Sequence, residues 1–363
     1  MAQSHTADQP SNEPSKTFLY RLDARLSTSP YWIVCALAWV IVAIKSGVLA
    51  RDSPVYLLAS FPYPEDRLTG TSYGLRLIAW ILRTESVTAY LVISIVLVAI
   101  TMVVMPWALR RRMSSLDARA AILLVTSGSI GTILLGNIGR TDVLVLLGAA
   151  LVGILGSRFR WTISGILIML LGNPEQALVS SVIYCICCFT PKLRSRIRPA
   201  LAGLLVAMAG TVVITIWTQA YGASGRVDYL GQFLGNSLYH FGRSWPLSLY
   251  AAYGVLWVVI TFAIWTNVRW QRFLLFSTGV LIPICVTAIT LDQTRGFVGV
   301  SAATAFALVT THVHDIRTQL TRRKLPVLVV TLGAVLLMPS IEIDYRGTLR
   351  PSYEWVFVWV SGK

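Results

Sequence analysis

Long apolar segments recur along almost the whole chain, and they constrain its fold more than any other feature. Runs of about 17–25 apolar residues have the length that an α-helix needs to cross the hydrocarbon core of a bilayer. Hydrophobic residues make up 55% of the 363 residues, whereas charged residues make up 13%. A soluble core cannot bury this much apolar surface. The sequence therefore predicts an all-α fold, a polytopic transmembrane helical bundle.

The apolar runs predict a transmembrane domain over residues 31–341, with about ten spans plus a broken re-entrant helix pair at 161–190. This domain lies between a polar cytoplasmic N-terminal tail at 1–30 and a short outer C-terminal tail at 342–363. The expected continuous spans are 31–50, 88–109, 120–137, 142–157, 199–220, 246–266, 273–291, 296–313 and 326–341.

The segment 161–190 is too short for two full spans, although basic residues flank it on both sides. Its break is at Asn173-Pro174, where asparagine is a favoured helix N-cap and proline suits the first helical position. Glu175 follows in the first turn, where an acid complements the helix dipole. The sequence therefore predicts two half-helices that meet inside the membrane, where protein or a cavity must cover the non-helical backbone.

The basic residues predict the orientation of the chain. If the N-terminus is cytoplasmic, the inner loops carry most of the 31 basic residues but few of the 16 acidic ones. This asymmetry follows the positive-inside rule, so we expect a multi-pass protein of the cell inner (plasma) membrane with its active face outside. The net charge of +15 is then a topology signal and a fit to anionic lipid headgroups, and no nucleic-acid partner is expected.

Four acidic residues open helices on the predicted outer side: Asp52, Asp142, Glu175 and Asp292. One interpretation is that each acid complements a helix N-terminus, which stabilises the helix by about 0.3–1 kcal/mol. Because all four occur at one membrane level, the alternative is a cavity lined with carboxylates and arginines.

Two arginines lie at the mouths of spans on the same side, Arg140 and Arg295. Arginine binds phosphate through its planar fork of N–H groups, and a lipid-linked phosphate lies at this depth of the membrane. The sequence therefore predicts a phosphate site at these arginines. The alternative is two local ion pairs, Arg140 with Asp142 and Arg295 with Asp292.

Two long outer loops are expected, at 51–87 and 221–245. The second loop offers Arg226, His240 and Arg243 as substrate-binding residues, beside several aromatic side chains. Aromatic residues at this depth are first of all interfacial belt residues, and a lone histidine more often has a structural role. No spacing predicts a metal site and no cofactor is required, although the outer acids are compatible with a divalent cation.

An acid directly follows the first span, at Arg51-Asp52, and the short motifs GNIGRTD (136–142), LGNPEQA (171–177) and LDQTR (291–295) mark later outer segments. With this layout the chain resembles the GT-C superfamily of membrane glycosyltransferases. The resemblance implies a polyprenyl-phosphate-linked sugar as donor and an envelope glycan or lipid as acceptor. It also implies that Asp52 is the catalytic base that deprotonates the acceptor hydroxyl.

Two other functions stay open on the sequence alone. A polysaccharide polymerase or ligase of the O-antigen or capsule type would use the same outer arginines, and Arg226 and Arg243 would then matter more. A transporter or lipid flippase belongs to another class, and a broken helix with an intramembrane Glu175 is common in transporters. The charged residues concentrate on one face, which favours chemistry at one leaflet over transport across both.

Overall fold

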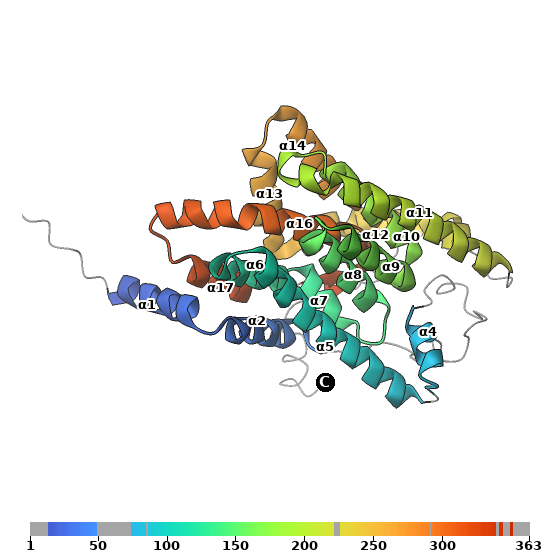
Figure 1. Ribbon diagram of the computed structural model, residues 1–363, viewed down its shortest axis with the longest axis horizontal. Helices are drawn as coiled ribbons and strands as arrows, with labels where there is room; N and C mark the ends of the chain where they lie inside the picture. Colours follow the sequence, from blue (N-terminus) through green and yellow to red (C-terminus); the bar gives the residue numbers. More distant parts are fainter. Residues whose placement is uncertain are drawn as a thin grey trace, which may run out of the picture.

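The computed structural model describes residues 14–48, 74–84, 86–220, 226–290, 292–338, 341–343 and 349–350, and nearly all of them are helical (Figure 1). The expected all-α class is therefore confirmed. The elements are α1 (Pro14–Thr28), α2 (Tyr31–Ser46), α4 (Gly74–Ile81), α5 (Val87–Arg112), α6 (Ser115–Ser127), α7 (Ser129–Gly136), α8 (Asp142–Leu155), α9 (Phe159–Gly172), α10 (Pro174–Cys187), η1 (Pro191–Arg196), α11 (Ile197–Ala220), α12 (Arg226–Tyr253), η2 (Gly254–Leu256), α13 (Trp257–Thr266), α14 (Arg269–Phe276), the π-helical turn η3 (Ser277–Leu281), α15 (Ile282–Ala288), α16 (Gln293–Arg322), α17 (Val327–Leu337), and the antiparallel strands β1 (Glu342–Ile343) and β2 (Leu349–Arg350).

The chain is a membrane protein, because within its described part five helical segments are long and apolar enough to cross a bilayer. The number rises to seven if each sharply bent pair, α1 with α2 and α6 with α7, is one span. The expected count of about ten spans is not confirmed. The difference comes from helices such as α8 and α9, whose 14 residues reach about 21 Å, short of the ~30 Å hydrocarbon core. The five long segments are Val87–Arg112, Pro191–Ala220, Phe233–Thr266, Arg269–Ala288 and Gln293–Arg322.

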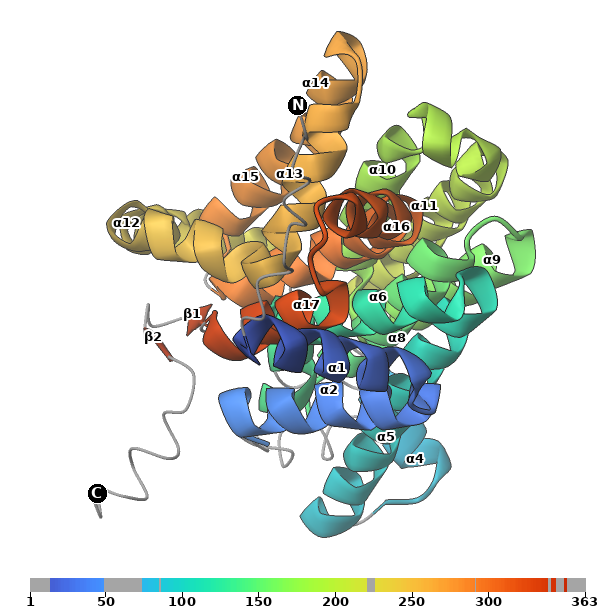
Figure 2. The same ribbon diagram turned by 90° about the vertical axis from the view of Figure 1, so that its left-hand side faces the viewer.

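Helix α8 lies in the interior of the bundle, and all of its residues are buried (Figures 1 and 2). A helix that is apolar all round its surface is expected to be buried. It packs against α5, α9 and α16, and the first half of α16 is buried with it. By contrast, α5 and α11 expose large apolar side chains such as Val96 and Leu205, as expected of helices that face lipid.

Two glycines allow α8 and α9 to approach each other closely. A Cβ atom placed at Gly148 would lie 2.3 Å from the carbonyl oxygen of Gly165, and one at Gly165 would lie 2.6 Å from the carbonyl oxygen of Gly148. Small residues at helix crossings are the usual means of close packing inside membranes. This contact holds α9 against the buried α8.

The broken segment predicted at 161–190 is present as two short helices, α9 and α10, that meet at Asn173. The Oδ1 atom of Asn173 accepts a hydrogen bond from the backbone N–H of Gln176 at 3.0 Å, which confirms the expected N-cap. A Cβ atom placed at Gly172 would lie 3.0 Å from the carbonyl oxygen of Thr141. The tip of the hairpin therefore lies beside the start of α8.

Two expected elements differ in the structure. The segment expected as an outer loop at 221–245 is helical from Arg226 onward, because α12 is continuous from Arg226 to Tyr253. Its apolar residues recur at helical spacing among polar ones, a pattern typical of an amphipathic helix. The span expected at 120–137 is broken at Gly128, where α6 and α7 meet at 60°.

The molecule has two chemically different ends. Helices α8 and α16 run parallel, because Asp142 contacts Arg295 at their starts and Gly153 lies against Ala303 further along. We call the end that holds Asp142 and Arg295 the ion-pair end. Figure 2 views the molecule from the opposite end, with α16 nearly end-on. We call this second end the arginine end, because it carries Arg110, Arg111, Arg112, Arg158, Arg194, Arg198 and Arg322.

Candidate functional site

Arg295 joins two acids at the ion-pair end of the bundle. Its Nε and Nη2 atoms donate to Oδ2 of Asp142 at 2.9 and 2.8 Å, and its Nη1 atom donates to Oδ2 of Asp292 at 2.5 Å. Asp142 is the first residue of α8, and Asp292 directly precedes α16. The local pair of Arg295 with Asp292 is thus confirmed, and the structure adds Asp142 as a second partner from another helix.

Arg140 extends this arrangement from the turn between α7 and α8. Its Nη1 atom lies 3.5 Å from Oδ2 of Asp292. The turn contains Gly139, whose φ of 94° lies in the left-handed region that favours glycine. The hydroxyl of Tyr90 on α5 donates to the carbonyl oxygen of Gly139 at 3.0 Å and holds the turn in place. Four predicted site residues therefore meet in one group, which we call the ion-pair cluster: Arg140, Asp142, Asp292 and Arg295.

The ion-pair cluster alternates in charge and sums to zero. Its acids lie at the starts of two parallel helices, where the helix dipoles favour negative charge. The side chains of Asp142 and Arg295 are 9% and 20% exposed, so their attraction is only partly screened by water. The Oδ1 atom of Asp292 is buried and has no hydrogen-bond partner in the part of the chain that the structure describes. It is therefore a buried acceptor whose hydrogen-bonding capacity no described residue uses.

The tip of the α9–α10 hairpin lies beside the ion-pair cluster. Glu175 is half-buried in the first turn of α10. A Cβ atom placed at Gly299, one turn beyond Arg295 on α16, would lie 2.3 Å from Oε1 of Gln176. The residue after Glu175 thus packs against α16, while Gly172 lies against the start of α8. The structure therefore places Glu175 at the level of the cluster.

His240 lies on the stripe of α12 that faces the start of α16. Ser244 and Ser248 follow it at four-residue spacing, and their hydroxyls donate to Oε1 of Gln293 at 3.3 and 2.5 Å. Ser244 also donates to the carbonyl oxygen of His240 at 2.8 Å. The histidine is half-buried and lies about one helical turn from the residues that contact the first turn of α16.

The structure does not bring Arg226 and Arg243 into the ion-pair cluster. Arg243 is exposed on α12. Arg226 is the first residue of the same helix, and it precedes Ser244 by about 27 Å along the helix axis. The continuous helix separates the backbone positions of these two arginines along its axis.

Glu342 is a buried acid at the ion-pair end that the sequence analysis assigned only to a tail. Its Oε1 atom accepts a hydrogen bond from Nδ2 of Asn137 at 3.3 Å. The backbone N–H of Ile343 donates to Oγ1 of Thr294 at 2.9 Å, so this segment packs between the end of α7 and the start of α16. The signal in the sequence was the alternation of isoleucine and glutamate, typical of a short strand with one polar face.

Arg76 is a second charged residue that the sequence analysis missed. It lies in α4, is 1% exposed, and is near enough to Tyr90 for the two side chains to interact electrostatically. Tyr90 in turn holds the turn that carries Arg140. The sequence feature that indicates Arg76 is a single arginine inside a short apolar segment. Burying such a charge is costly, so it usually has a structural or functional role.

Asp52, the expected catalytic base, lies outside the described residues, as does most of the expected loop 51–87. Among the residues that are described, no three His, Cys, Asp or Glu side chains converge on a point where they could hold a metal ion.

No family model, curated protein or solved structure matches this chain. The chemistry of this chain is therefore inferred from the ion-pair cluster, whose side chains are of two chemical kinds. The arginines can bind an oxyanion by exchange with a carboxylate, and the carboxylates can accept a proton from a hydroxyl.

Proposed function

We propose that this protein is a membrane glycosyltransferase of the plasma membrane. It moves a sugar from a polyprenyl-phosphate-linked donor to an envelope glycan or lipid acceptor at the outer leaflet. The observation that carries the proposal is the ion-pair cluster, two arginines and two carboxylates held at the starts of two helices beside the re-entrant tip. Sugar transfer from a lipid phosphate needs cations for the leaving phosphate and a carboxylate for the acceptor hydroxyl.

In this proposal Arg140 and Arg295 hold the donor phosphate. The guanidinium of Arg295 is oriented by both acids, which engage all three of its nitrogens. Arg140 meets Asp292 at 3.5 Å, longer than the ~2.7–2.9 Å of a charge-assisted hydrogen bond. Arg140 and Arg295 lie on the same carboxylate, so a phosphate bound at the cluster would meet two cations, one of them held in orientation by both acids.

Two carboxylates are candidates for the base. The resemblance to GT-C enzymes assigns the role to Asp52. Among the described residues, Asp292 offers a buried Oδ1 atom without a hydrogen-bond partner, next to both arginines. In either case the base takes the proton of the acceptor hydroxyl as that oxygen bonds to the anomeric carbon. The bond from this carbon to the lipid phosphate breaks, and the arginines stabilise the charge on the departing phosphate.

Two observations weigh against the other functions. A polymerase or ligase was expected to rely on Arg226 and Arg243, which lie away from the ion-pair cluster. A transporter needs polar groups along a path through the membrane. Lys45, a cation within the second helix, instead donates from Nζ to the carbonyl oxygens of Val335 and Met338 at 2.5 and 2.6 Å. It therefore caps the end of α17 and does not line a path.

The test is transfer of radiolabelled sugar from polyprenyl-phosphate-sugar by the purified protein in detergent. We expect Arg140→Ala to lower turnover by about 10²–10³-fold, the usual effect of removing one group that stabilises a developing oxyanion. Comparing Asp52→Asn with Asp292→Asn identifies the base. Replacing the carboxylate that acts as the base should lower turnover by about 10²–10⁴-fold.

Arg194→Ala is the matched control for this experiment. Arg194 is exposed at the arginine end, so the variant removes the same charge far from the cluster and should keep full activity. No transfer by the folded protein from any monosaccharide donor would overturn the proposal.

A further inference from the structure

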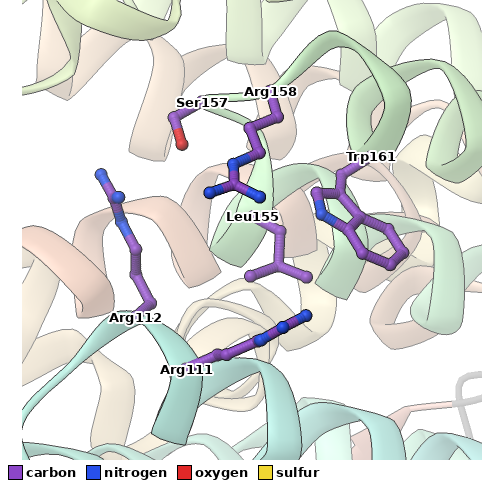
Figure 3. A pocket seen from close by; sticks show the side chains of 6 residues that line it. All are labelled: Arg111, Arg112, Leu155, Ser157, Arg158 and Trp161. Carbon is purple, nitrogen blue, oxygen red and sulfur yellow. The ribbon is translucent and has the colours of Figure 1, made fainter.

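A cavity of about 130 Å³ lies at the arginine end, between the end of α5 and the turn that joins α8 to α9 (Figure 3). This volume corresponds to roughly four water molecules at ~30 Å³ each, which is enough room for a tetrahedral oxyanion. The residues that line the cavity are Arg111, Arg112, Leu155, Ser157, Arg158 and Trp161.

Three arginines reach this cavity from two elements. Arg111 and Arg112 are the last residues of α5, and Arg158 directly precedes α9. Figure 3 shows Arg158 pointing from its turn toward the end of α5. In the part of the chain that the structure describes, none of the three forms an ion pair within 4.0 Å. A fourth arginine, Arg196, is buried nearby and repels Arg112.

No carboxylate lines this cavity, whereas two other basic residues at the arginine end have acidic partners. Nε of Arg317 lies 2.6 Å from Oδ1 of Asp117, and Lys192 pairs with Asp315. Like charges held close together at the edge of a low-dielectric bundle repel one another. An anion in the cavity would offset this repulsion. No carboxylate in the described part of the chain lines the cavity to provide that negative charge.

Two further features of the cavity suit an oxyanion. The hydroxyl of Ser157 is a hydrogen-bond donor, and the first turn of α9 directs backbone N–H groups toward this side. The rings of Trp107 and Trp161 pack edge to face at 5.8 Å, and the guanidinium of Arg111 lies 5.1 Å from the Trp107 ring centre. The aromatic pair therefore restrains one of the three arginines at the cavity.

We propose that this cavity is a phosphate-binding site in which Arg111, Arg112 and Arg158 hold the phosphate oxygens. The phosphate can belong to an anionic lipid headgroup or to a soluble phosphate, which share this chemistry. A basic pocket between helices near the membrane surface is a recurrent site for anionic headgroups. The site is separate from the ion-pair cluster, since Asp142 and Leu155 lie at opposite ends of α8, about 20 Å apart.

The experiment measures thermal unfolding of the purified full chain in a neutral detergent. Phosphatidylglycerol is the anionic lipid probe, phosphatidylcholine is the lipid without net charge, and inorganic phosphate is the soluble probe. We expect a saturable rise of Tm with phosphatidylglycerol or with inorganic phosphate. In the triple variant R111Q/R112Q/R158Q the half-saturating concentration should rise at least about tenfold, because each hydrogen bond to a charged group contributes about 1.5–3 kcal/mol.

The matched control is R194Q/R198Q/R322Q, which removes three exposed arginines from the same end but none from the cavity. We expect its half-saturating concentration to stay within about twofold of the unchanged protein, because none of these three arginines lines the cavity. A response to phosphatidylglycerol alone identifies a lipid as the source, and a response to inorganic phosphate identifies a soluble one. Equal losses in the two triple variants, or no rise of Tm with either probe, would overturn the proposal.

A second variant keeps the test decisive if the glutamine variant does not fold. R111K/R112K/R158K retains the charge but loses the planar forks that bind two oxygens at once. We expect binding weakened several-fold relative to the unchanged protein. Unchanged binding by this lysine variant would contradict a site built from arginine forks.

Discussion

At the scale of single residues, Arg295 is the side chain on which the ion-pair cluster depends, because it pairs with Asp142 and Asp292 at once. Removing one member of a partly buried ion pair leaves an uncompensated charge, and this costs more than removing both members. Removing Arg295 leaves two carboxylates facing each other at the starts of two parallel helices. The stability of the bundle should therefore be sensitive to this residue beyond any role in binding.

We expect Arg295→Gln to lower the free energy of unfolding by about 3–5 kcal/mol, the usual cost of leaving a buried charge unpaired. Adding Asp142→Asn to this variant should recover part of the loss, because it removes the carboxylate that pairs with Arg295, whereas Asp292 keeps Arg140 at 3.5 Å. Chemical unfolding in detergent, followed by tryptophan fluorescence, measures both effects. The exposed Arg243→Gln is the control and should change stability by less than about 0.5 kcal/mol. Simple additivity of the two cluster substitutions would contradict the coupling.

At the scale of elements, local rules predicted the hairpin better than they predicted α12. The break between α9 and α10 follows from the cap at Asn173 and the proline after it, and both act within one turn. Only the last part of helix α12 was expected in a span, at 246–266, and the part before it was expected in an outer loop. The structure shows instead that one face of it packs on the start of α16. That contact is tertiary, so hydropathy along the chain did not indicate it.

The close crossing of α8 and α9 predicts that replacing its glycine by alanine destabilises the protein. The same replacement at a control glycine on α12 should not. Gly148→Ala places a methyl group 2.3 Å from a backbone oxygen, so we expect a loss of about 1–3 kcal/mol from overpacking. Gly235 on α12 has no heavy atom within 4 Å of the same position. Gly235→Ala should be neutral or stabilising by up to about 1 kcal/mol, because alanine favours helix. Thermal unfolding of the two variants in detergent tests this, and equal effects would rule out the close crossing.

At the scale of the whole molecule, the charged groups are separated between two ends. One end carries the neutral ion-pair cluster, and the other carries arginines in excess over acids. This polarity agrees with the positive-inside pattern of the sequence, from which the arginine end is expected to face the cytoplasm. The expected count of about ten membrane-crossing helices is not confirmed, because in the described part of the chain apolar runs such as α8 form helices too short to cross alone and buried inside the bundle.

The orientation is tested with single cysteines in a protein whose five native cysteines are replaced. We expect Ser86→Cys, exposed directly before α5 near the ion-pair end, to react with a membrane-impermeant maleimide in intact cells. Ser195→Cys, at the arginine end in η1, should react only after the membrane is permeabilised, because basic loops remain cytoplasmic. The reverse pattern of labelling would invert the orientation and would place the ion-pair cluster on the cytoplasmic side.

The sequence by itself determined the helical class, the membrane character, the break at Asn173 and the charged positions that open α8 and α16. These features depend on the length of apolar runs and on capping within a turn, so they can be read locally. Only the tertiary structure decided that Arg295 pairs with Asp142 as well as Asp292, and that Glu342 reaches Asn137. It also decided that arginines from two elements share one cavity. Such contacts depend on how distant helices pack, and no local pattern of residues specifies those distances.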